Sequence, residues 1–159
     1  MTALRTREGD RLARDLRICL VAARFNELIV DRLIAGATDA LIRQGASDKN
    51  LELVRVPGCF DLPLIAQRLA LSRRYDGLIA LGAVIRGETA HFEYVAGQCA
   101  AGISQAALES GVPIAFGVLT CANLEQALDR AGGKAGNKGF EAAVTAVEMA
   151  NLMRKLTQG

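Results

Sequence analysis

Short apolar runs recur along the chain, and segments with a different hydrophobic pattern separate them. Each run is flanked by glycine, proline or polar and charged residues, which is typical of a β-strand. The pattern predicts four strands, at Ile18–Ala23, Leu51–Val56, Gly77–Ile85 and Val112–Leu119.

Between these runs, apolar residues return every three or four positions, as they do on one face of a helix. The first helical pattern consists of Val30, Leu33, Ile34, Ala37 and Leu41, and Gly45 ends it. The further helices expected are Leu62–Leu71, Thr89–Glu109, Asn123–Arg130 and Phe140–Leu156, with a glycine-rich loop over residues 132–139. Asn123 and Thr120 are both candidate caps for the short helix.

Strands that alternate with helices indicate an α/β fold in which helices cover both faces of a parallel sheet. Ligands of such sheets bind beyond the carboxyl ends of the strands. This rule selects residues 24–26, 57–61, 83–91 and 116–120 as candidate site segments.

The stretch from Leu78 to Tyr94 is the most informative of these segments. Its apolar run ends in the turn Arg86–Thr89, and His91, the single histidine of the chain, follows directly. A glycine-containing turn before a helix can bind an anion through free backbone N–H groups. A histidine beside it favours proton transfer next to a phosphate or carboxylate. An ordinary strand-to-helix turn with a surface histidine explains these residues equally well.

Other candidate residues also have an ordinary explanation beside a functional one. Phe25 could stack on a planar ring or simply pack at a strand end. Asp61 could bind hydroxyls or amides, or favour the dipole of its helix. Arg130 could clamp a phosphate or complement a helix C-terminus. Lys138 precedes a helix N-terminus, where a cation is unfavourable unless an anion is bound.

Composition and charge exclude several classes of protein. Hydrophobic residues make up 51% and charged residues 23%, which suits one soluble domain, expected over residues 18–159. The formal net charge of +2 resides in an arginine-rich tail at residues 1–17. We expect this tail to be frayed or bound to a partner. A basic stripe for nucleic acid is missing from the sequence, and so is an apolar run of about 20 residues for a membrane span.

The four cysteines do not suggest a metal site. Cys19, Cys59, Cys99 and Cys121 form no CxxC pair, and with one histidine the sequence shows no zinc-binding motif. We therefore expect reduced thiols, no metal and a cytoplasmic protein.

The motifs taken together resemble lumazine synthase, the penultimate enzyme of riboflavin biosynthesis. The matching strings are ARFN (23–26), VPGCFDLP (56–63), YDG (75–77), ALGAVIRGETAHF (80–92), FGVLT (116–120), RAGGKAGNKG (130–139) and EMANL (148–152). GETAH and AGNKG are the most specific, and the resemblance spans roughly residues 18–153.

The resemblance implies a reaction, a fold and an assembly. 5-Amino-6-(D-ribitylamino)uracil would condense with 3,4-dihydroxy-2-butanone 4-phosphate to give 6,7-dimethyl-8-ribityllumazine, phosphate and water, without a metal or organic cofactor. The implied fold is a flavodoxin-like three-layer α/β/α sandwich. Members of the family form homopentamers, sometimes as decamers or sixty-subunit shells, with active sites between neighbouring subunits.

The resemblance also implies a role for each matching residue. One subunit would bind the pyrimidine at Phe25, Ala83, Val84 and Ile85, the ribityl chain at Gly58, Cys59, Phe60 and Asp61, and the phosphate at Gly87, Glu88 and Thr89. Asn26 would also bind substrate. His91 would move protons. The neighbouring subunit would contribute Phe116 over the ring, Arg130 on the phosphate and Lys138 near both.

Three positions depart from the usual family pattern: Asp61 replaces Glu, Cys59 replaces Ala, and Ala90 replaces Pro. None of them removes a group that the reaction needs.

Two other functions fit parts of the sequence: a non-catalytic relative that carries a flavin or lumazine, and an FMN-binding electron carrier. His91 and Arg130 argue against the first, and ARFN in place of a Ser/Thr-rich phosphate loop argues against the second.

Overall fold

The four expected strands form one parallel sheet in the computed structural model, which describes residues 3–159. They are β1 (Ile18–Ala23), β2 (Leu51–Val56), β3 (Gly77–Ile85) and β4 (Ile114–Cys121), in the order β2-β1-β3-β4. The first three have the predicted bounds. The fourth begins and ends two residues later than predicted, and the Pro113 carbonyl just before it accepts a bond from Leu78 N.

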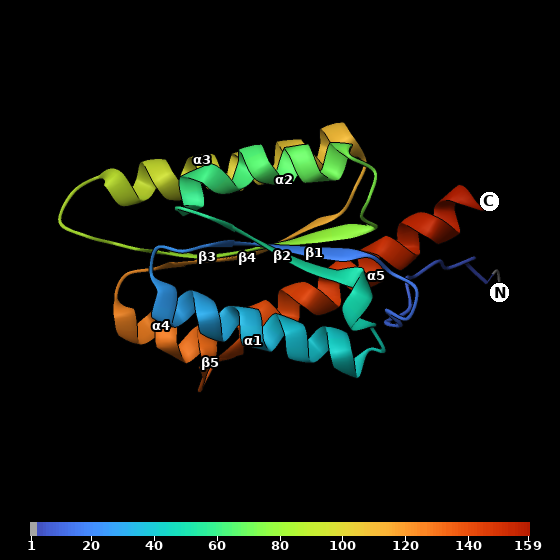
Figure 1. Ribbon diagram of the computed structural model, residues 1–159, viewed down its shortest axis with the longest axis horizontal. Helices are drawn as coiled ribbons and strands as arrows, with labels where there is room; N and C mark the ends of the chain where they lie inside the picture. Colours follow the sequence, from blue (N-terminus) through green and yellow to red (C-terminus); the bar gives the residue numbers. More distant parts are fainter. Residues whose placement is uncertain (1–2) are drawn as a thin grey trace.

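Helices cover both faces of this sheet (Figure 1). Helices α2 (Leu62–Leu71) and α3 (His91–Ser110) lie on one face, and α1 (Glu27–Arg43), α4 (Leu124–Arg130) and α5 (Lys138–Thr157) lie on the other. Short 3-10 turns, η1 (Asp48–Asn50) and η2 (Cys59–Asp61), flank β2. The expected three-layer α/β/α sandwich with a central parallel sheet is confirmed.

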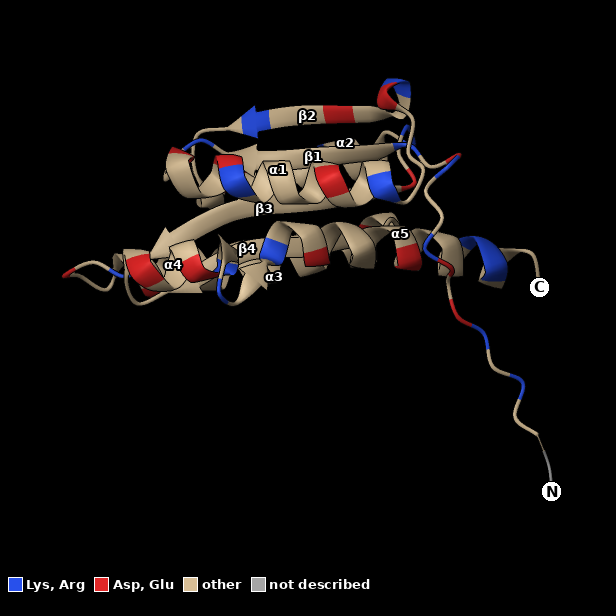
Figure 2. Cartoon of the chain, turned by 90° about the horizontal axis from the view of Figure 1, so that it is seen from below, with Lys and Arg blue, Asp and Glu red and all other residues tan. Residues whose placement is uncertain are grey.

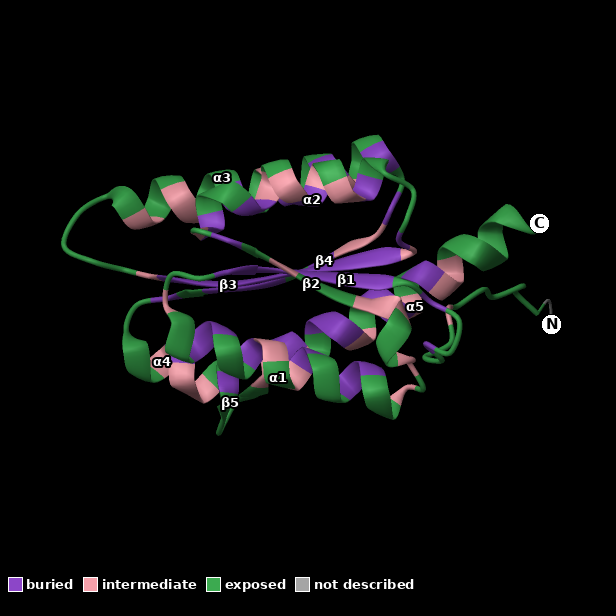
Figure 3. Ribbon diagram, in the orientation of Figure 1, coloured by how far each residue is buried: buried purple, intermediate pink, exposed green. Residues whose placement is uncertain are grey.

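The core consists of two apolar layers, one on each side of the sheet. The central strands β1 and β3 are buried almost along their whole length, whereas the helices bury only their inner faces (Figure 3). Helix α1 contributes the stripe that its spacing predicted, with Ile29, Val30, Leu33, Ala37, Ala40 and Leu41 buried.

Helix α3 begins at His91, two residues later than the sequence predicted. Residues 86–90 form an exposed loop, and Ala90 stands at the N-cap position without a side-chain cap bond. The hydroxyl of Thr89 instead accepts a bond from His91 N at 3.4 Å. The expected turn at the helix start is therefore a longer loop, and His91 lies in the first turn of the helix.

The glycine-rich segment before α5 is a small hairpin rather than the expected loop. Strands β5 (Ala131–Gly133) and β6 (Gly136–Asn137) pair antiparallel, and α5 starts two residues before the predicted Phe140. Asn137 caps that helix by accepting a bond from Phe140 N at 3.1 Å. A Cβ on Gly139 would lie 2.1 Å from the Leu33 carbonyl oxygen, so glycine permits the close approach of α1 to α5.

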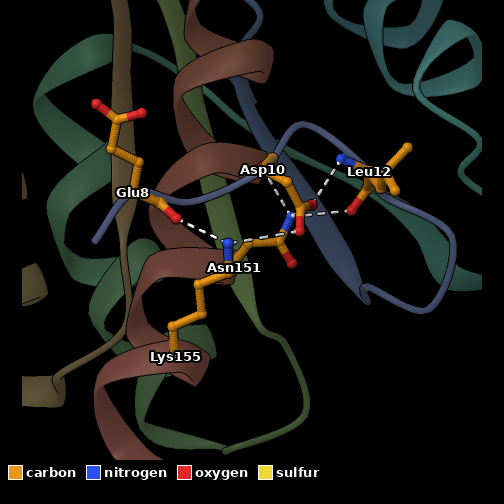
Figure 4. A network of polar contacts seen from close by, with 5 residues as sticks. All are labelled: Glu8, Asp10, Leu12, Asn151 and Lys155. Atoms are coloured by element: carbon orange, nitrogen blue, oxygen red, sulfur yellow. Dashed lines mark hydrogen bonds and ion pairs between the residues drawn. The ribbon is translucent and has the colours of Figure 1, made fainter. Parts of the chain in front are cut away.

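The N-terminal segment is held against α5, and Figure 4 shows this contact. The Asn151 side-chain nitrogen donates to the carbonyl and carboxylate oxygens of Asp10 and to the Leu12 carbonyl, each at 2.9 Å. Lys155 Nζ donates to the Glu8 carbonyl at 2.8 Å.

Two apolar residues of the same segment enter the core. Ala13 and Leu16 are 0% and 1% exposed, and Ala13 N donates to the Gln44 carbonyl at 2.8 Å. The expectation of a frayed tail is therefore wrong for residues 8–16. Isolated apolar positions among arginines gave no periodic signal that would have predicted this packing.

Basic and acidic residues are interspersed over the helices and strands seen in Figure 2. Several are paired, as in Arg55 with Asp31 at 3.2 Å and Arg43 with Asp39 at 2.9 Å. In the part of the chain that the structure describes, none of the helices is long and apolar enough to cross a membrane.

Candidate active site

The carboxyl ends of β1 and β3 and the turn after β2 meet at a cavity of about 180 Å³, which we name the β3 cavity. Segments far apart in the sequence contribute to its wall, as expected for a parallel sheet. Nine of the residues that sequence reasoning selected line it: Phe25, Asn26, Cys59, Ala83, Val84, Ile85, Gly87, Thr89 and His91.

A wider cavity of about 640 Å³ adjoins the first, and we name it the aromatic cavity. The two share Phe25, Cys59, His91 and Val95. The aromatic cavity adds the predicted residues Gly58, Phe60 and Asp61, together with Pro57 and Tyr94. Its aromatic rings are open to solvent, since Phe25 is 73%, Phe60 62% and Tyr94 71% exposed.

The turn after β1 is tied to both neighbouring strands. Phe25 N donates to the Pro57 carbonyl at 3.1 Å, which fixes the residue beside the end of β2. Asn26 adopts the left-handed conformation, with φ 66°, and its Nδ2 donates to the Ala83 carbonyl at 2.8 Å. These bonds present the Phe25 ring at the mouth of the cavities.

Asp61 closes the turn after β2. Its Oδ2 accepts a bond from Gly58 N at 3.0 Å, which stabilises the 3-10 turn η2. The short aspartate side chain is thus folded back on its own turn. Asp61 therefore has a structural role in its turn and also lines the aromatic cavity.

Cys59 is part of the wall between the two cavities and is almost completely buried. Burial raises the pKa of its thiol to about 11; a main-chain hydrogen bond at Ala83 opposes this rise, and the Asp61 carboxylate adds to it. The thiol therefore stays protonated at neutral pH and is a poor nucleophile. A Cβ on Gly82 would lie 2.5 Å from Cys59 Sγ, so glycine at position 82 leaves room for the sulfur.

His91 is exposed and lines both cavities from the first turn of α3. The loop before it is held by Arg86, whose guanidinium lies 4.7 Å from the Phe92 ring centre and 3.2 Å from a Glu93 carboxylate oxygen. The exposed Glu88 lies on this loop and lines none of the cavities described here.

Sequence reasoning missed three residues of the same helix that line the cavities: Phe92, Tyr94 and Val95. Helical spacing could have identified two of them. Tyr94 and Val95 lie three and four positions after His91, and such residues share a helix face.

The remaining predicted residues lie elsewhere. Arg130 and Lys138 line a separate cavity of about 300 Å³ at the end of β4, together with Thr120, Cys121 and Glu141; we name it the β4 cavity. Arg130 donates from NH1 to the Gln126 carbonyl at 3.0 Å, so its guanidinium folds along its own helix. Burial raises the pKa of the Cys121 thiol, and the Arg130 charge opposes that rise.

Phe116 joins neither group. It lies on β4, an edge strand, and is 36% exposed there. One chain therefore brings twelve of the predicted residues together around the β3 and aromatic cavities, and leaves Glu88, Phe116, Arg130 and Lys138 outside them.

The fold and the residues that line these cavities indicate an α/β protein with a ligand site at the edge of its sheet. Exposed aromatic rings, one carboxylate and one histidine line these cavities at the carboxyl edge of a parallel sheet, where ligands of α/β sandwiches bind. Among residues 3–159, no three His, Cys, Asp or Glu side chains gather as ligands for a metal ion.

Comparison with known proteins identifies the family. The family model described as 6,7-dimethyl-8-ribityllumazine synthase matches residues 15–154. A protein of that name from Halorhodospira halophila (strain DSM 244 / SL1) is 59% identical over 150 residues, which are 94% of this chain and 96% of that protein. Another, from Nitratidesulfovibrio vulgaris (strain DP4), is 54% identical over 156 residues, or 98% of this chain and 100% of that protein.

The chain therefore belongs to the 6,7-dimethyl-8-ribityllumazine synthase family. It is an enzyme, a transferase of riboflavin biosynthesis. Its reaction is the condensation of 5-amino-6-(D-ribitylamino)uracil with 3,4-dihydroxy-2-butanone 4-phosphate to 6,7-dimethyl-8-ribityllumazine, phosphate and water.

Proposed function

We propose that the β3 cavity binds the pyrimidine ring of the first substrate and that the adjoining aromatic cavity binds its ribityl chain. The observation that carries this proposal is the convergence of nine residues from three segments on one small cavity. Phe25 stacks on the ring, and the main chain of Ala83–Ile85 binds its polar edge. Residues Gly58–Asp61 bind the ribityl hydroxyls through backbone groups and the free Asp61 oxygen.

His91 is the proton carrier of the reaction. The condensation forms an imine, eliminates phosphate and closes a ring, and each of these steps moves a proton. His91 lies where the β3 cavity meets the loop Gly87–Thr89, so one imidazole reaches both the ring and the place proposed for the phosphate. Free N–H groups of this loop and of the first turn of α3 bind the phosphate.

The second half of the site comes from a neighbouring subunit. Phe116, Arg130 and Lys138 line neither of the two substrate cavities of their own chain, and the Phe25 and Phe60 rings stand open to solvent. A homopentamer, or a multiple of it, resolves both features, because a heterologous contact repeated around a ring places one face of each subunit on the next. Phe116 of one subunit then covers the ring, and Arg130 and Lys138 neutralise the phosphate.

The reaction requires only the two substrates, and the site residues supply binding, orientation and proton transfer. We also propose a cytoplasmic location. The four thiols are free and buried in the described structure, which accords with a reducing compartment.

The direct test uses purified protein with both substrates and follows lumazine by its fluorescence. Phe25→Ala should raise the KM of the pyrimidine substrate, because a lost aromatic stack removes about 0.5–1.5 kcal/mol, or roughly 2–10-fold in affinity. Light scattering of the same sample should give the mass of a pentamer or a multiple. Active monomers at micromolar concentration would refute the shared site.

A further inference from the structure

We propose that Asn26 is a positioning residue for this reaction: its side-chain amide joins the end of β1 to the end of β3, and so sets Phe25 and Ala83–Ile85 as two walls of one cavity. The inference deepens the proposed function, because it rests on the β3 cavity being the pyrimidine site. It assigns Asn26 a different task from the substrate contact that the family resemblance implies.

The register of the sheet shows why a side chain is needed here. The last pair between β1 and β3 is Ala22 with Leu81, so β3 continues beyond its neighbour. On its other side, β3 stays paired with β4 as far as Ile85 and Cys121. The Ala83 carbonyl lies in the stretch that β1 does not reach, and Asn26 Nδ2 donates to it at 2.8 Å. The amide replaces a missing main-chain bond of the sheet.

The backbone conformation of Asn26 also supports a role in joining β1 to β3. Its φ of 66° and ψ of 45° are left-handed, a conformation that asparagine tolerates better than most residues other than glycine. Asn26 also occupies the N-cap position of α1, where asparagine commonly bonds to the first turn of its helix. Here the side chain makes no such cap bond, because its amide is directed to β3.

The consequence concerns the geometry of the cavity. Phe25 is held on one side by the bond from its N to the Pro57 carbonyl, and Asn26, next along the chain, holds the other side through Ala83. Phe25 and Ala83 both line the β3 cavity. Without the Asn26 amide both walls remain, but the hydrogen bond no longer fixes the distance between them. A ring bound between the walls is then aligned less well.

Two variants separate the amide from the backbone conformation. Asn26→Gly keeps the left-handed turn and removes the amide. Asn26→Asp keeps the size of the side chain but places a carboxylate, which cannot donate, against a carbonyl oxygen. We expect Asn26→Gly to reduce kcat/KM for the pyrimidine substrate about 2–10-fold, the range of one lost neutral hydrogen bond, and Asn26→Asp to reduce it further. The KM of the butanone phosphate should change much less.

Arg73 provides a matched control at the opposite end of the sheet. It is the other non-glycine residue with a left-handed backbone among residues 3–159, with φ 63°, and its NH1 donates to the Ser110 carbonyl at 2.8 Å. Arg73→Gly therefore removes a side-chain bond to a main-chain carbonyl, in this case from a charged donor to the end of α3, before the start of β3. The melting temperature should fall at least as much in Arg73→Gly as in Asn26→Gly, because the bond from a charged donor is the stronger one, while the pyrimidine KM changes only in Asn26→Gly.

The outcomes distinguish this inference from the proposed function. If Phe25→Ala raises the KM of the pyrimidine substrate but Asn26→Gly, like Arg73→Gly, lowers only the melting temperature, Asn26 has no positioning role and the proposed site stands. If neither Phe25→Ala nor Asn26→Gly alters the kinetics, the site itself is misplaced. A crystal structure with bound 6,7-dimethyl-8-ribityllumazine decides between positioning and direct binding. Asn26 Nδ2 should remain within hydrogen-bond distance of the Ala83 carbonyl, and a turn of this amide onto the ligand would overturn the inference.

Discussion

The β3 cavity and the β4 cavity lie at the same edge of one sheet, yet they offer opposite chemistry. The first is lined by Phe25, main-chain groups and a single histidine, His91. The second contains two cations, Arg130 and Lys138, with one carboxylate, Glu141. A planar ring and its proton transfers suit the first surface, and a phosphate suits the second. One chain therefore carries both halves of the required chemistry on separate surfaces.

The path of the chain explains why the two surfaces stay apart although β3 and β4 are neighbours. After β3, the chain leads through the loop 86–90 to α3 on one face of the sheet (Figure 1). After β4, it leads directly to α4 on the opposite face. The last paired residues, Ile85 and Cys121, are thus followed by segments that diverge. The proposed site uses both surfaces by way of a second chain, and the following changes test this proposal.

Removing the imidazole should have the largest effect, and it should fall on chemistry rather than on binding. His91→Ala should lower kcat about 100-fold or more, the usual contribution of a positioned acid or base. Affinity for the lumazine product should change little, because Phe25 and the turn Gly58–Asp61 still bind it. Stopped-flow turnover and a fluorescence titration measure the two quantities. Full turnover in the variant would remove His91 from the mechanism.

Removing the cation of the β4 cavity should affect the other substrate. Arg130→Ala should raise the KM of the butanone phosphate about tenfold or more, since a hydrogen bond to a charged group contributes about 1.5–3 kcal/mol. The KM of the pyrimidine substrate should change much less. Arg43→Ala is the matched control, because Arg43 also ends a helix but lies exposed beside Asp39. Equal weakening of both substrates by Arg130→Ala would make this arginine structural.

The smallest expected effect is on stability at alkaline pH. It involves two buried thiols, Cys59 in the β3 cavity and Cys121 in the β4 cavity. The Cys59 pKa is raised by burial to about 11 from 9.0, and that of Cys121 is raised with Arg130 opposing the rise. Between pH 9 and about 11, the unfolded chain loses the Cys59 proton first, so the free energy of unfolding falls by roughly 1.4 kcal/mol per pH unit for this thiol. Below pH 9 its contribution is complete.

Thermal melting from pH 8 to 10.5 should therefore show a shallower decline for Cys59→Ala than for the parent protein. Cys121→Ala should flatten the decline less, because the Arg130 charge limits the shift at that thiol. An equal slope in all three proteins would show that Cys59 is not desolvated in the folded state.

Sequence periodicity was sufficient for the architecture, because burial of alternating strands and helices leaves a strong local pattern. It predicted three strands to the residue and placed the candidate segments at the correct edge of the sheet. It missed what depends on single tertiary contacts. The Asn26 bond to Ala83 and the burial of Ala13 and Leu16 involve distant partners, and periodicity does not encode such pairs.

Some predicted boundaries of helices and loops were also wrong, for local reasons. The helix was predicted to begin at Thr89, directly after the glycine-containing turn. It begins at His91, whose N–H donates to the Thr89 hydroxyl. At Gly132–Gly139 the glycines predicted a loop, whereas left-handed φ values at Gly132 and Gly136 form a hairpin. Periodicity did not predict that Arg130 and Lys138 lie apart from the β3 cavity. Only the family resemblance predicted this, because it implied a site shared by two subunits.

Reassembly of two inactive variants tests the shared site most directly. One variant carries His91→Ala with Asp61→Ala, and the other carries Arg130→Ala with Phe116→Ala; each alone should be nearly inactive. After joint unfolding and reassembly in equal amounts, a site is intact only where a subunit with normal His91 meets a neighbour with normal Arg130. Random mixing around a ring makes about one quarter of the interfaces intact, so about a quarter of the parent activity should return. Failure of mixing to restore activity, with mixed oligomers verified by mass spectrometry, would contradict a site built from two chains.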